Sequence, residues 1–246
     1  MAGTPAAQAT YSAAVFDMDG LLLDSERPVQ EAWMQTAAEF GVPLTPTAYL
    51  DLIGRNHRDS TLRLRAIFGD DALLADAHRR AAALLAQRFG DRPFDVKAGA
   101  RRLLAGLRAA RIPCAVASST QHAEIGRRLA RAGLLDFFAA VCGGDEVTHG
   151  KPAPDIYRLA VERLGVRAAT TLAFEDSGHG ALAAIAAGLG VVVVPDLKAP
   201  EPAWQSRSVA VLDSLDAVAA HSRAWFGIEL DRSDDEAGPQ AAHPLA

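Results

Sequence analysis

The sequence predicts an α/β protein in which helices cover both faces of a parallel sheet and an all-helical segment is inserted after the first strand. Short, continuously apolar runs alternate with longer helical patterns over most of the chain, as is typical of strands buried in a parallel sheet. Residues 26 to about 89 break this alternation, because they show helical periodicity throughout and contain no convincing strand.

Five apolar runs are the predicted strands, and five amphipathic runs between and after them are predicted helices. The strands are 13–16, 113–117, 139–142, 171–174 and 190–194, and the helices are 99–110, 121–132, 154–164, 178–187 and 212–225. Gly133 and Gly165 are placed where a glycine commonly ends a helix.

The inserted segment is expected to form a separate cap domain of four helices, divided by Gly, Pro and Asp. We assign residues 25–96 to this cap, and residues 1–24 together with 97–246 to a discontinuous catalytic core. The polar end of the chain, from about 230 to 246, is expected to be a flexible tail.

Composition excludes several classes of protein. The 246 residues carry a net charge of −5, whereas a nucleic-acid-binding protein normally has a basic surplus. No apolar run reaches the roughly 18 residues that cross a bilayer, and the first residues lack the features of a signal peptide. Cys114 and Cys142 are too few for a disulfide framework or a zinc site. We therefore expect a cytoplasmic protein that contacts neither nucleic acid nor membrane, and we expect a monomer.

Two acids follow the first predicted strand directly. Asp17 and Asp19 are two residues apart, so at an extended strand end both carboxylates can face one point, and Gly20 allows a sharp turn after them. Ligands of open parallel sheets bind beyond the carboxyl ends of the strands. Asp is also a common turn residue, so this motif has a structural interpretation as well.

Three further motifs lie after later strands. Ser118, Ser119 and Thr120 offer hydroxyl and backbone N–H groups to an anion, although such residues also cap helices. Lys151 is flanked by Gly and Pro, which favours a fixed cation. Glu175 and Asp176 form a second acidic pair. Two like charges about 4 Å apart cost roughly 4 kcal/mol at an effective dielectric near 20, so four acids at one edge indicate a hard cation, for which Mg²⁺ fits best.

The ordered motifs FDMDGLLLDS, VASST, GKPAPD and EDSGHG, with a helical insert after the first, resemble the haloacid dehalogenase-like (HAD) hydrolases. Within that superfamily, the chain is similar to the subgroup of β-phosphoglucomutase and the sugar-phosphate phosphatases, over about residues 13 to 195. The resemblance implies a Rossmann-like core with a helical cap, and a Mg²⁺-dependent enzyme that acts on a small phosphorylated metabolite.

The resemblance also implies roles for the motif residues. Asp17 would be the nucleophile that forms an aspartyl-phosphate, and Asp19 would be the acid and base, with its backbone carbonyl on the metal. Ser118, Ser119 and Lys151 would bind the phosphoryl group, with Lys151 also offsetting the charge of the nucleophile. The implied metal residues are Asp17, Asp19, Glu175 and Asp176, of which Glu175 would act directly or through water.

Substrate selection is expected to come from the cap, where Arg55, His57 and Arg58 are the candidate contacts, although they could equally cap and solvate a helix. In the related mutase, an arginine in this region binds the distal phosphate. Other basic residues are interpreted as structural or as ordinary charged surface. They are His122, His149, His179, Arg101, Arg102, Arg127, Arg128 and Arg131.

Three functions remain open at this point: a phosphatase, a mutase and a non-catalytic binding protein. The mutase has a histidine in the first cap helix that restrains its acid/base aspartate, and Val29 stands at that place here. Without that restraint, water should resolve the aspartyl-phosphate, which favours a phosphatase. A binding protein would be expected to have lost one of the acids, and none is missing.

Overall fold

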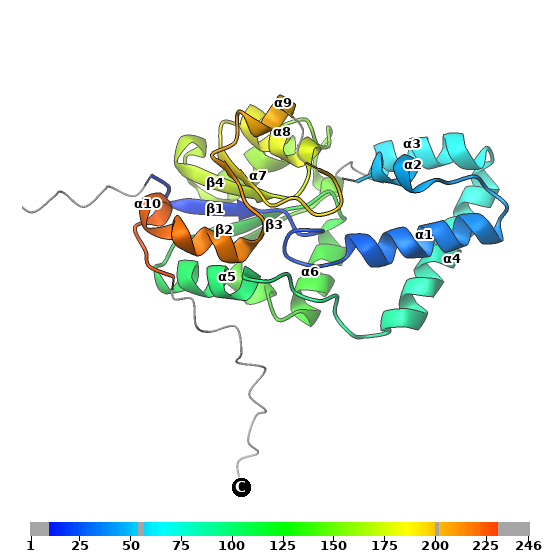
Figure 1. The fold of residues 1–246 in the computed structure, drawn as a ribbon, viewed down its shortest axis with the longest axis horizontal. Coiled ribbons are helices and arrows are strands. Elements are labelled where there is room, and N and C mark those ends of the chain that lie inside the picture. The colour runs from blue at the N-terminus through cyan, green and yellow to red at the C-terminus, as the bar shows by residue number, and fades with distance from the viewer. Residues whose placement is uncertain (1–9, 54–56, 200–201, 231–246) are drawn as a thin grey trace, which may run out of the picture.

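A computed structural model describes residues 10–53, 57–199 and 202–230 of the chain. A core built on a β-sheet lies beside a group of helices (Figure 1). Within these ranges, six strands form one parallel sheet in the order β3-β2-β1-β4-β5-β6. Their bounds are β1 Ala13–Phe16, β2 Cys114–Ala117, β3 Ala140–Cys142, β4 Thr171–Glu175, β5 Gly190–Val193 and β6 Ala210–Val211. The predicted α/β class is therefore confirmed.

The strand order explains how distant motifs can meet. Strand β1 is central and pairs with β2 on one side and with β4 on the other. Parallel strands end at the same edge of a sheet, so the residues that follow β1, β2 and β4 come together there. The first, second and fourth motifs of the sequence follow these three strands.

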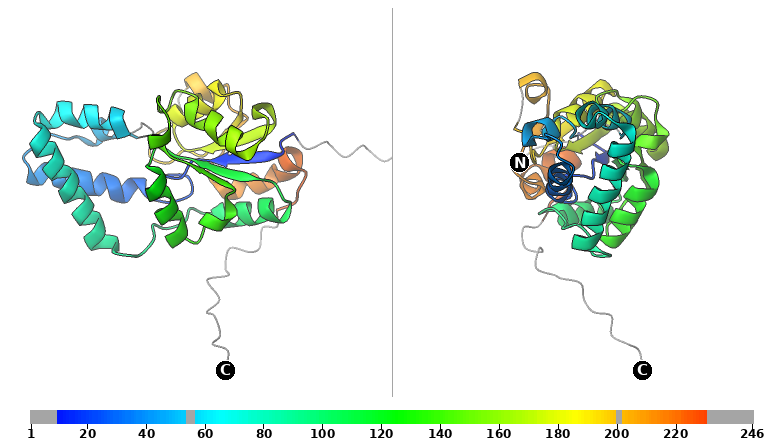
Figure 2. Two further views of the ribbon diagram at one scale, coloured as in Figure 1. Left: turned by 180° about the vertical axis from the view of Figure 1, so that it is seen from behind. Right: turned by 90° about the vertical axis from the view of Figure 1, so that its right-hand side faces the viewer.

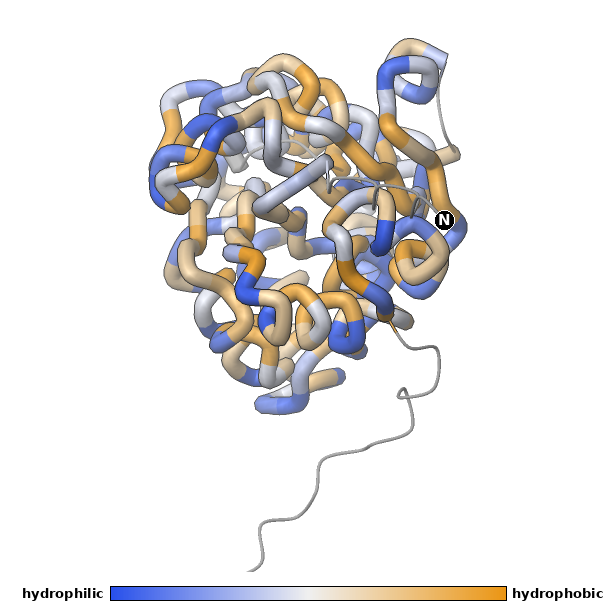
Figure 3. The backbone as a smooth tube through the Cα atoms, turned by 90° about the vertical axis from the view of Figure 1, so that its left-hand side faces the viewer, coloured by the Kyte–Doolittle hydropathy of each residue, from blue (hydrophilic) through white to orange (hydrophobic). Residues whose placement is uncertain are grey.

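Helices cover both faces of the sheet because side chains alternate along each buried strand. Phe16 and Phe174 point to one face and stack with ring centroids 4.8 Å apart. That face is covered by α5 (Ala100–Ala109), α6 (His122–Arg131), η4 (Leu215–Ala220) and α10 (Ser222–Phe226). The other face is covered by α7 (Asp155–Leu164), α8 (Gly178–Ala186) and α9 (Pro202–Gln205). Hydrophobic and hydrophilic stretches alternate around the helical turns (Figure 3).

In the described part of the inserted segment, four helices pack around a hydrophobic cluster of their own. Figure 2 shows these helices grouped beside the core. They are α1 Glu26–Glu39, α2 Pro46–Leu50, α3 His57–Phe68 and α4 Asp71–Phe89. Thr45 and Asp70 cap α2 and α4 by accepting hydrogen bonds from backbone N–H groups. The four predicted helices are present, while the domain limits at 25 and 96 stay a prediction.

The two segments that join this cap to the core run side by side. Leu23 and Val96 form an antiparallel bridge, and the N–H of Asp24 donates to the carbonyl of Asp95 at 2.8 Å. Asp196, in the loop after β5, accepts from Arg27 at 2.6 Å and from Lys97 at 2.9 Å. The junction between cap and core is therefore tied by backbone bonds and by ion pairs.

Some details differ from the sequence-based expectations. The predicted helix 212–225 is instead the 3-10 helix η4 followed by the short helix α10, and the two-residue strand β6 precedes it. Further 3-10 turns are η1 Leu135–Phe137, η2 Gly144–Glu146 and η3 Ala168–Thr170. Most of the predicted tail lies outside the described residues. Within the described ranges, no helix is long and apolar enough to cross a membrane.

Candidate active site

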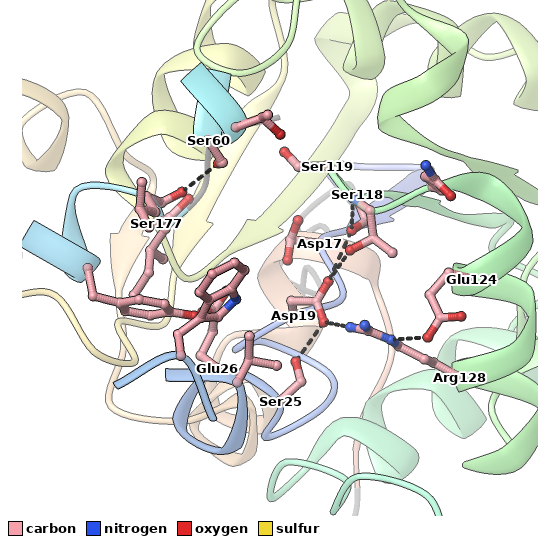
Figure 4. Close-up of a pocket in the computed structure, with 18 of the residues that line it drawn as sticks. Asp17, Asp19, Ser25, Glu26, Ser60, Ser118, Ser119, Glu124, Arg128 and Ser177 are labelled. Atoms are coloured by element: carbon pink, nitrogen blue, oxygen red, sulfur yellow. Dashed lines mark hydrogen bonds and ion pairs between the residues drawn. The ribbon is translucent and has the colours of Figure 1, made fainter. Parts of the chain in front are cut away.

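A cavity of about 580 Å³ lies between the carboxyl edge of the sheet and the cap. From the core it is lined by residues of the first, second and fourth motifs, among them Asp17, Asp19 and Asp176. From the cap, the described lining is half apolar and half polar. The apolar residues are Val29, Trp33, Leu52, Ile53, Leu64 and Ala82, and the polar ones are Ser25, Glu26, Tyr49, Ser60, Thr61 and His78. Figure 4 shows the carboxylates of the first motif at the centre of this cavity. The predicted convergence of distant acids on one edge is therefore observed.

Asp17 is the first residue after β1, and it is held by a buried lysine. Lys151 is 2% exposed, and its Nζ donates to Asp17 Oδ1 at 2.6 Å and to Glu175 Oε1 at 2.5 Å. Burial disfavours both charges, but the two carboxylates raise the pKa of Lys151 above its usual value. Burial, together with Glu175 and Asp19, outweighs Lys151 and raises the pKa of Asp17 to about 7. Lys151 is therefore a fixed cation behind the nucleophile position.

Glu175 lies behind the cavity and is fully buried. Its Oε1 also accepts from the Tyr157 hydroxyl at 2.6 Å, and its Oε2 accepts from Ser177 Oγ at 3.0 Å and Ser177 N at 3.2 Å. Both oxygens are therefore occupied by protein donors. This carboxylate fixes Lys151 and the start of α8.

Asp176 has a different environment. It is buried, it lines the cavity, and it forms no hydrogen bond or ion pair with the residues that the structure describes. Burial first, and then the charges of Glu175, Asp17 and Glu26, raise its pKa well above the usual value. Gly20 has φ +82°, and a Cβ built there would lie 2.5 Å from Asp176 Oδ2. The turn after Asp19 thus needs glycine both for its conformation and for the close approach of Asp176.

The oxygen donors of this edge fit a hard divalent cation. Asp17 lies close enough to Asp176 for its charge to raise the pKa of Asp176. Asp176 has no ion-pair partner among the described side chains. No group of three or more His, Cys, Asp or Glu in the described ranges is arranged to hold a metal by itself. Mg²⁺ usually takes one or two carboxylates and completes its shell with water and substrate phosphate. Two carboxylates and a backbone carbonyl would therefore suffice.

Asp19 lines the cavity, and four side-chain donors surround its carboxylate (Figure 4). Its Oδ1 accepts from Ser25 Oγ at 2.6 Å and from Arg128 Nη1 at 2.7 Å, and its Oδ2 accepts from Thr120 Oγ1 at 2.8 Å and Ser118 Oγ at 3.4 Å. Burial raises its pKa, but Arg128 and the three strongest hydrogen bonds outweigh burial and lower it below the usual value.

The interpretation of Arg128 as an ordinary surface residue is wrong. Arg128 extends from α6 into the cavity, where it pairs with Asp19 and with Glu124, which accepts at 2.8 Å. No feature of the sequence separates it from the other arginines of α6. Thr120 was already part of a motif, and its contact with Asp19 was missed because the motif was interpreted as an anion site.

Ser118 and Ser119 lie at the carboxyl end of β2. The N–H of Ser118 donates to the Cys142 carbonyl at 3.1 Å, while its hydroxyl accepts from the N–H of Thr120 at 3.1 Å. Ser119 Oγ is buried, borders the cavity and has no hydrogen-bond partner among the described residues. A buried hydroxyl without a partner is costly, so it indicates a bound ligand oxygen.

Glu26 is a further lining residue that was not selected from the sequence. It begins α1, and burial together with Asp19, Asp17 and Asp196 raises its pKa to about 8. Of the predicted cap contacts, Arg55 lies outside the described residues. For His57 and Arg58 only the backbone, at the start of α3, is described. His122 and His149 pair with Glu146 and Asp155 away from the cavity.

The fold and the site together define a capped α/β enzyme with paired carboxylates, a buried lysine and hydroxyl groups at one sheet edge. Residues 11–188 match the model of the haloacid dehalogenase-like hydrolases, and the chain belongs to this family. A phosphorylated carbohydrates phosphatase from Thermotoga maritima is 33% identical over 181 residues, which cover 72% of this chain and 82% of the relative. The prediction of a phosphoric monoester hydrolase of this family is confirmed.

Two solved structures show the same fold. A variant of CbbY from Rhodobacter sphaeroides, in complex with xylulose-(1,5)bisphosphate, has a TM-score of 0.70 and 27% identity. The match covers 83% of this chain and 95% of that one. A putative β-phosphoglucomutase from Thermotoga maritima has a TM-score of 0.65 and 31% identity, and covers 82% of this chain and 94% of its own. CbbY and a protein named as a putative mutase thus share the architecture of the chain.

Proposed function

We propose that the chain is a Mg²⁺-dependent phosphatase that hydrolyses a small phosphorylated metabolite, in particular a sugar phosphate. The observation that carries this proposal is the buried Lys151–Asp17 pair beside Asp176, an acid without a protein cation partner. A phosphate dianion can approach these acids only where positive charge is concentrated. Mg²⁺ would be held by Asp17, Asp176 and the backbone carbonyl of Asp19, and it would offset charge on the nucleophile and on the phosphoryl oxygens.

The side chains divide the remaining chemistry. Asp17 Oδ1 is held by Lys151, so Oδ2, which has no described protein partner, is the oxygen that attacks phosphorus. The Asp17–phosphorus bond forms as the ester bond breaks, and Asp19 gives its proton to the departing oxygen. Asp19 then takes a proton from water, which attacks phosphorus, breaks the Asp17–phosphorus bond and releases inorganic phosphate.

The other motif residues position the phosphoryl group. Ser118 and Ser119 would donate to its oxygens, and the unpartnered Ser119 hydroxyl supports this role. Lys151 would neutralise Asp17 and the transferred group. We propose that Glu175 holds Lys151 rather than the metal, because both of its oxygens are occupied by protein donors. Arg55, His57 and Arg58 stay the proposed cap contacts.

A phosphatase is favoured over a mutase by the relatives. The Thermotoga maritima relative is named for its action on phosphorylated carbohydrates, and CbbY was solved with a sugar bisphosphate. The similarity to the putative β-phosphoglucomutase leaves open the alternative function of a mutase, which transfers a phosphoryl group between two positions of one sugar. We also keep the prediction of a monomer. We keep the prediction of a cytoplasmic location as well, because Cys114 and Cys142 are both free thiols, as is usual in a reducing compartment.

The experiment is phosphate release from a panel of sugar phosphates, with Mg²⁺ and with a chelator. We expect release with Mg²⁺, loss with the chelator, and at least a thousandfold loss in Asp17→Asn. Asp136→Asn, an exposed carboxylate of the core, is the matched control. Interconversion of hexose 1- and 6-phosphates without net phosphate release would indicate a mutase. A folded protein that turns over no member of the panel would contradict the proposal.

A further inference from the structure

The carboxylate of Asp19 has no capacity left for a substrate in this structure. An ionised carboxylate offers about four lone-pair sites, and four donors occupy them: Ser25, Arg128, Thr120 and, at the longest distance, Ser118. A leaving oxygen or an attacking water must replace at least one of these donors. The conformation described here is therefore one in which Asp19 is held apart from the reaction.

Arg128 is the strongest of the four constraints. It is the charged donor of the set, and hydrogen bonds between charged groups are roughly twice as strong as neutral ones. Its own position is fixed on two sides, because Nε donates to Glu124 at 2.8 Å and the guanidinium lies 5.3 Å from the centre of the Phe94 ring. With 21% of its side chain exposed, it is shielded from the solvent that weakens surface ion pairs.

We propose that Arg128 is a positioning residue that holds Asp19 away from the substrate until the cap closes. This inference rests on the proposed function, in which Asp19 is the acid and base. Arg128 belongs to the core helix α6, so its restraint acts from the core, in addition to the bond from Ser25 at the start of the first cap helix.

The surroundings of the ion pair connect it to the cap. Ser25, which donates to Asp19, immediately precedes α1, and Phe94, which packs against Arg128, lies in the segment that returns from α4 to the core. Both segments joining cap and core thus contact the Asp19–Arg128 pair. A movement of the cap would shift these contacts, so a substrate that binds the cap can release Asp19 from Arg128. A substrate too small to reach the cap cannot release Asp19 in this way.

The test compares Arg128→Met with the wild type on two substrates. Acetyl phosphate is too small to engage the cap, and its acetate leaves without needing a proton, so its turnover reports water attack assisted by Asp19. A sugar phosphate from the panel engages the cap. We expect Arg128→Met to raise kcat for acetyl phosphate about tenfold and to change kcat for the sugar phosphate less than twofold. Arg128→Lys, which restores a cation, should return the ratio of the two rates toward that of the wild type.

Arg131→Met is the matched control, because Arg131 lies on the same helix and pairs with Asp91 at 2.9 Å, outside the cavity. Both rates should stay within twofold in this variant. A fall or no change in acetyl phosphate turnover in a folded Arg128→Met protein would overturn the proposal, because Arg128 would then support Asp19 or only stabilise the fold.

A structural measurement separates this inference from the proposed function. Crystals of Asp17→Asn without ligand should keep the Asp19–Arg128 pair, and crystals with a sugar phosphate under a closed cap should show it broken. A pair that stays intact in the closed complex would refute the restraint. Absence of phosphatase activity in the wild type would instead refute the proposed function, whatever the position of Asp19.

Discussion

Replacing Lys151 by methionine tests the electrostatic core of the site most directly. Lys151 is 2% exposed and is held between Asp17 and Glu175. Methionine is similar in length but carries no charge, so the variant leaves two buried carboxylates without their cation. Glu175 keeps its bonds from Tyr157 and Ser177, whereas Asp17 loses its side-chain donor. The cost should therefore fall mainly on Asp17.

Removal of one partner from a buried ion pair typically costs about 3–5 kcal/mol of unfolding free energy, and we expect this loss at pH 8. Asp17 already has a pKa of about 7 with Lys151 present, and that pKa rises further without it. A carboxyl whose folded pKa exceeds its unfolded value binds more protons when folded, so stability falls as pH rises between the two values. At pH 5.5 a proton replaces the lost cation, and the loss should shrink to about 1–2 kcal/mol.

The assay is urea unfolding of wild type and Lys151→Met at pH 5.5 and pH 8, in a chelating buffer. Lys151→Met combined with Asp17→Asn serves as the control, because removing the carboxylate that bears the cost should restore stability at pH 8 without restoring turnover. A loss of equal size at both pH values, or one below about 1 kcal/mol at pH 8, would show that the lysine does not carry the charge balance assumed here.

Two further predictions concern the turn after β1 and the first cap helix. Gly20→Ala should destabilise the protein more than Gly41→Ala and lower kcat, because both glycines have positive φ but only Gly20 meets Asp176. Gly41→Ala, with no neighbour within 4 Å, should cost about 1 kcal/mol, and equal losses in the two urea titrations would contradict the close contact. Glu26→Gln should stabilise the metal-free protein by about 2 kcal/mol at pH 9 and not at pH 5, because a folded pKa of about 8 makes the native carboxyl destabilising as pH rises. An equal difference in unfolding free energy between Glu26→Gln and the wild type at the two pH values would refute this prediction.

The catalytic core could be predicted from the sequence because its signals are local and short. Strand β1 is a run of buried apolar residues, so Asp17 and Asp19 had to follow it at the sheet edge. The same holds for Ser118 after β2 and for Asp176 after β4. Parallel pairing then brings these ends together without any further information. The helical insert was equally evident, because its period differs from that of the strands.

Contacts that depend on long side chains could not be predicted in this way. The role of Glu175 depends on where the Nζ of Lys151 lies, 24 residues earlier in the chain. The predicted helix 212–225 failed because its apolar residues fit the helical period, while tertiary packing of Leu215 and Trp225 against the sheet produces a 3-10 helix and a short helix instead. Periodicity identifies the buried face, but it does not distinguish one helical form from another.

Val29 carried the prediction of a phosphatase over a mutase, and the structure shows that its premise is incomplete. Hydrolysis was favoured because Val29 cannot restrain Asp19 as a histidine could, yet Asp19 is restrained here, by Arg128 from α6 and by Ser25 and Thr120. A restraint is a property of the carboxylate and its donors, and any neighbouring element can supply it. We therefore expect the choice between water and a sugar hydroxyl to be made after Asp19 is released, by what the closed cap admits to the proposed aspartyl-phosphate. The described cap wall combines apolar side chains such as Trp33 and Leu52 with polar ones such as His78, and we expect this wall, rather than the residue at one position, to select the acceptor that reaches phosphorus.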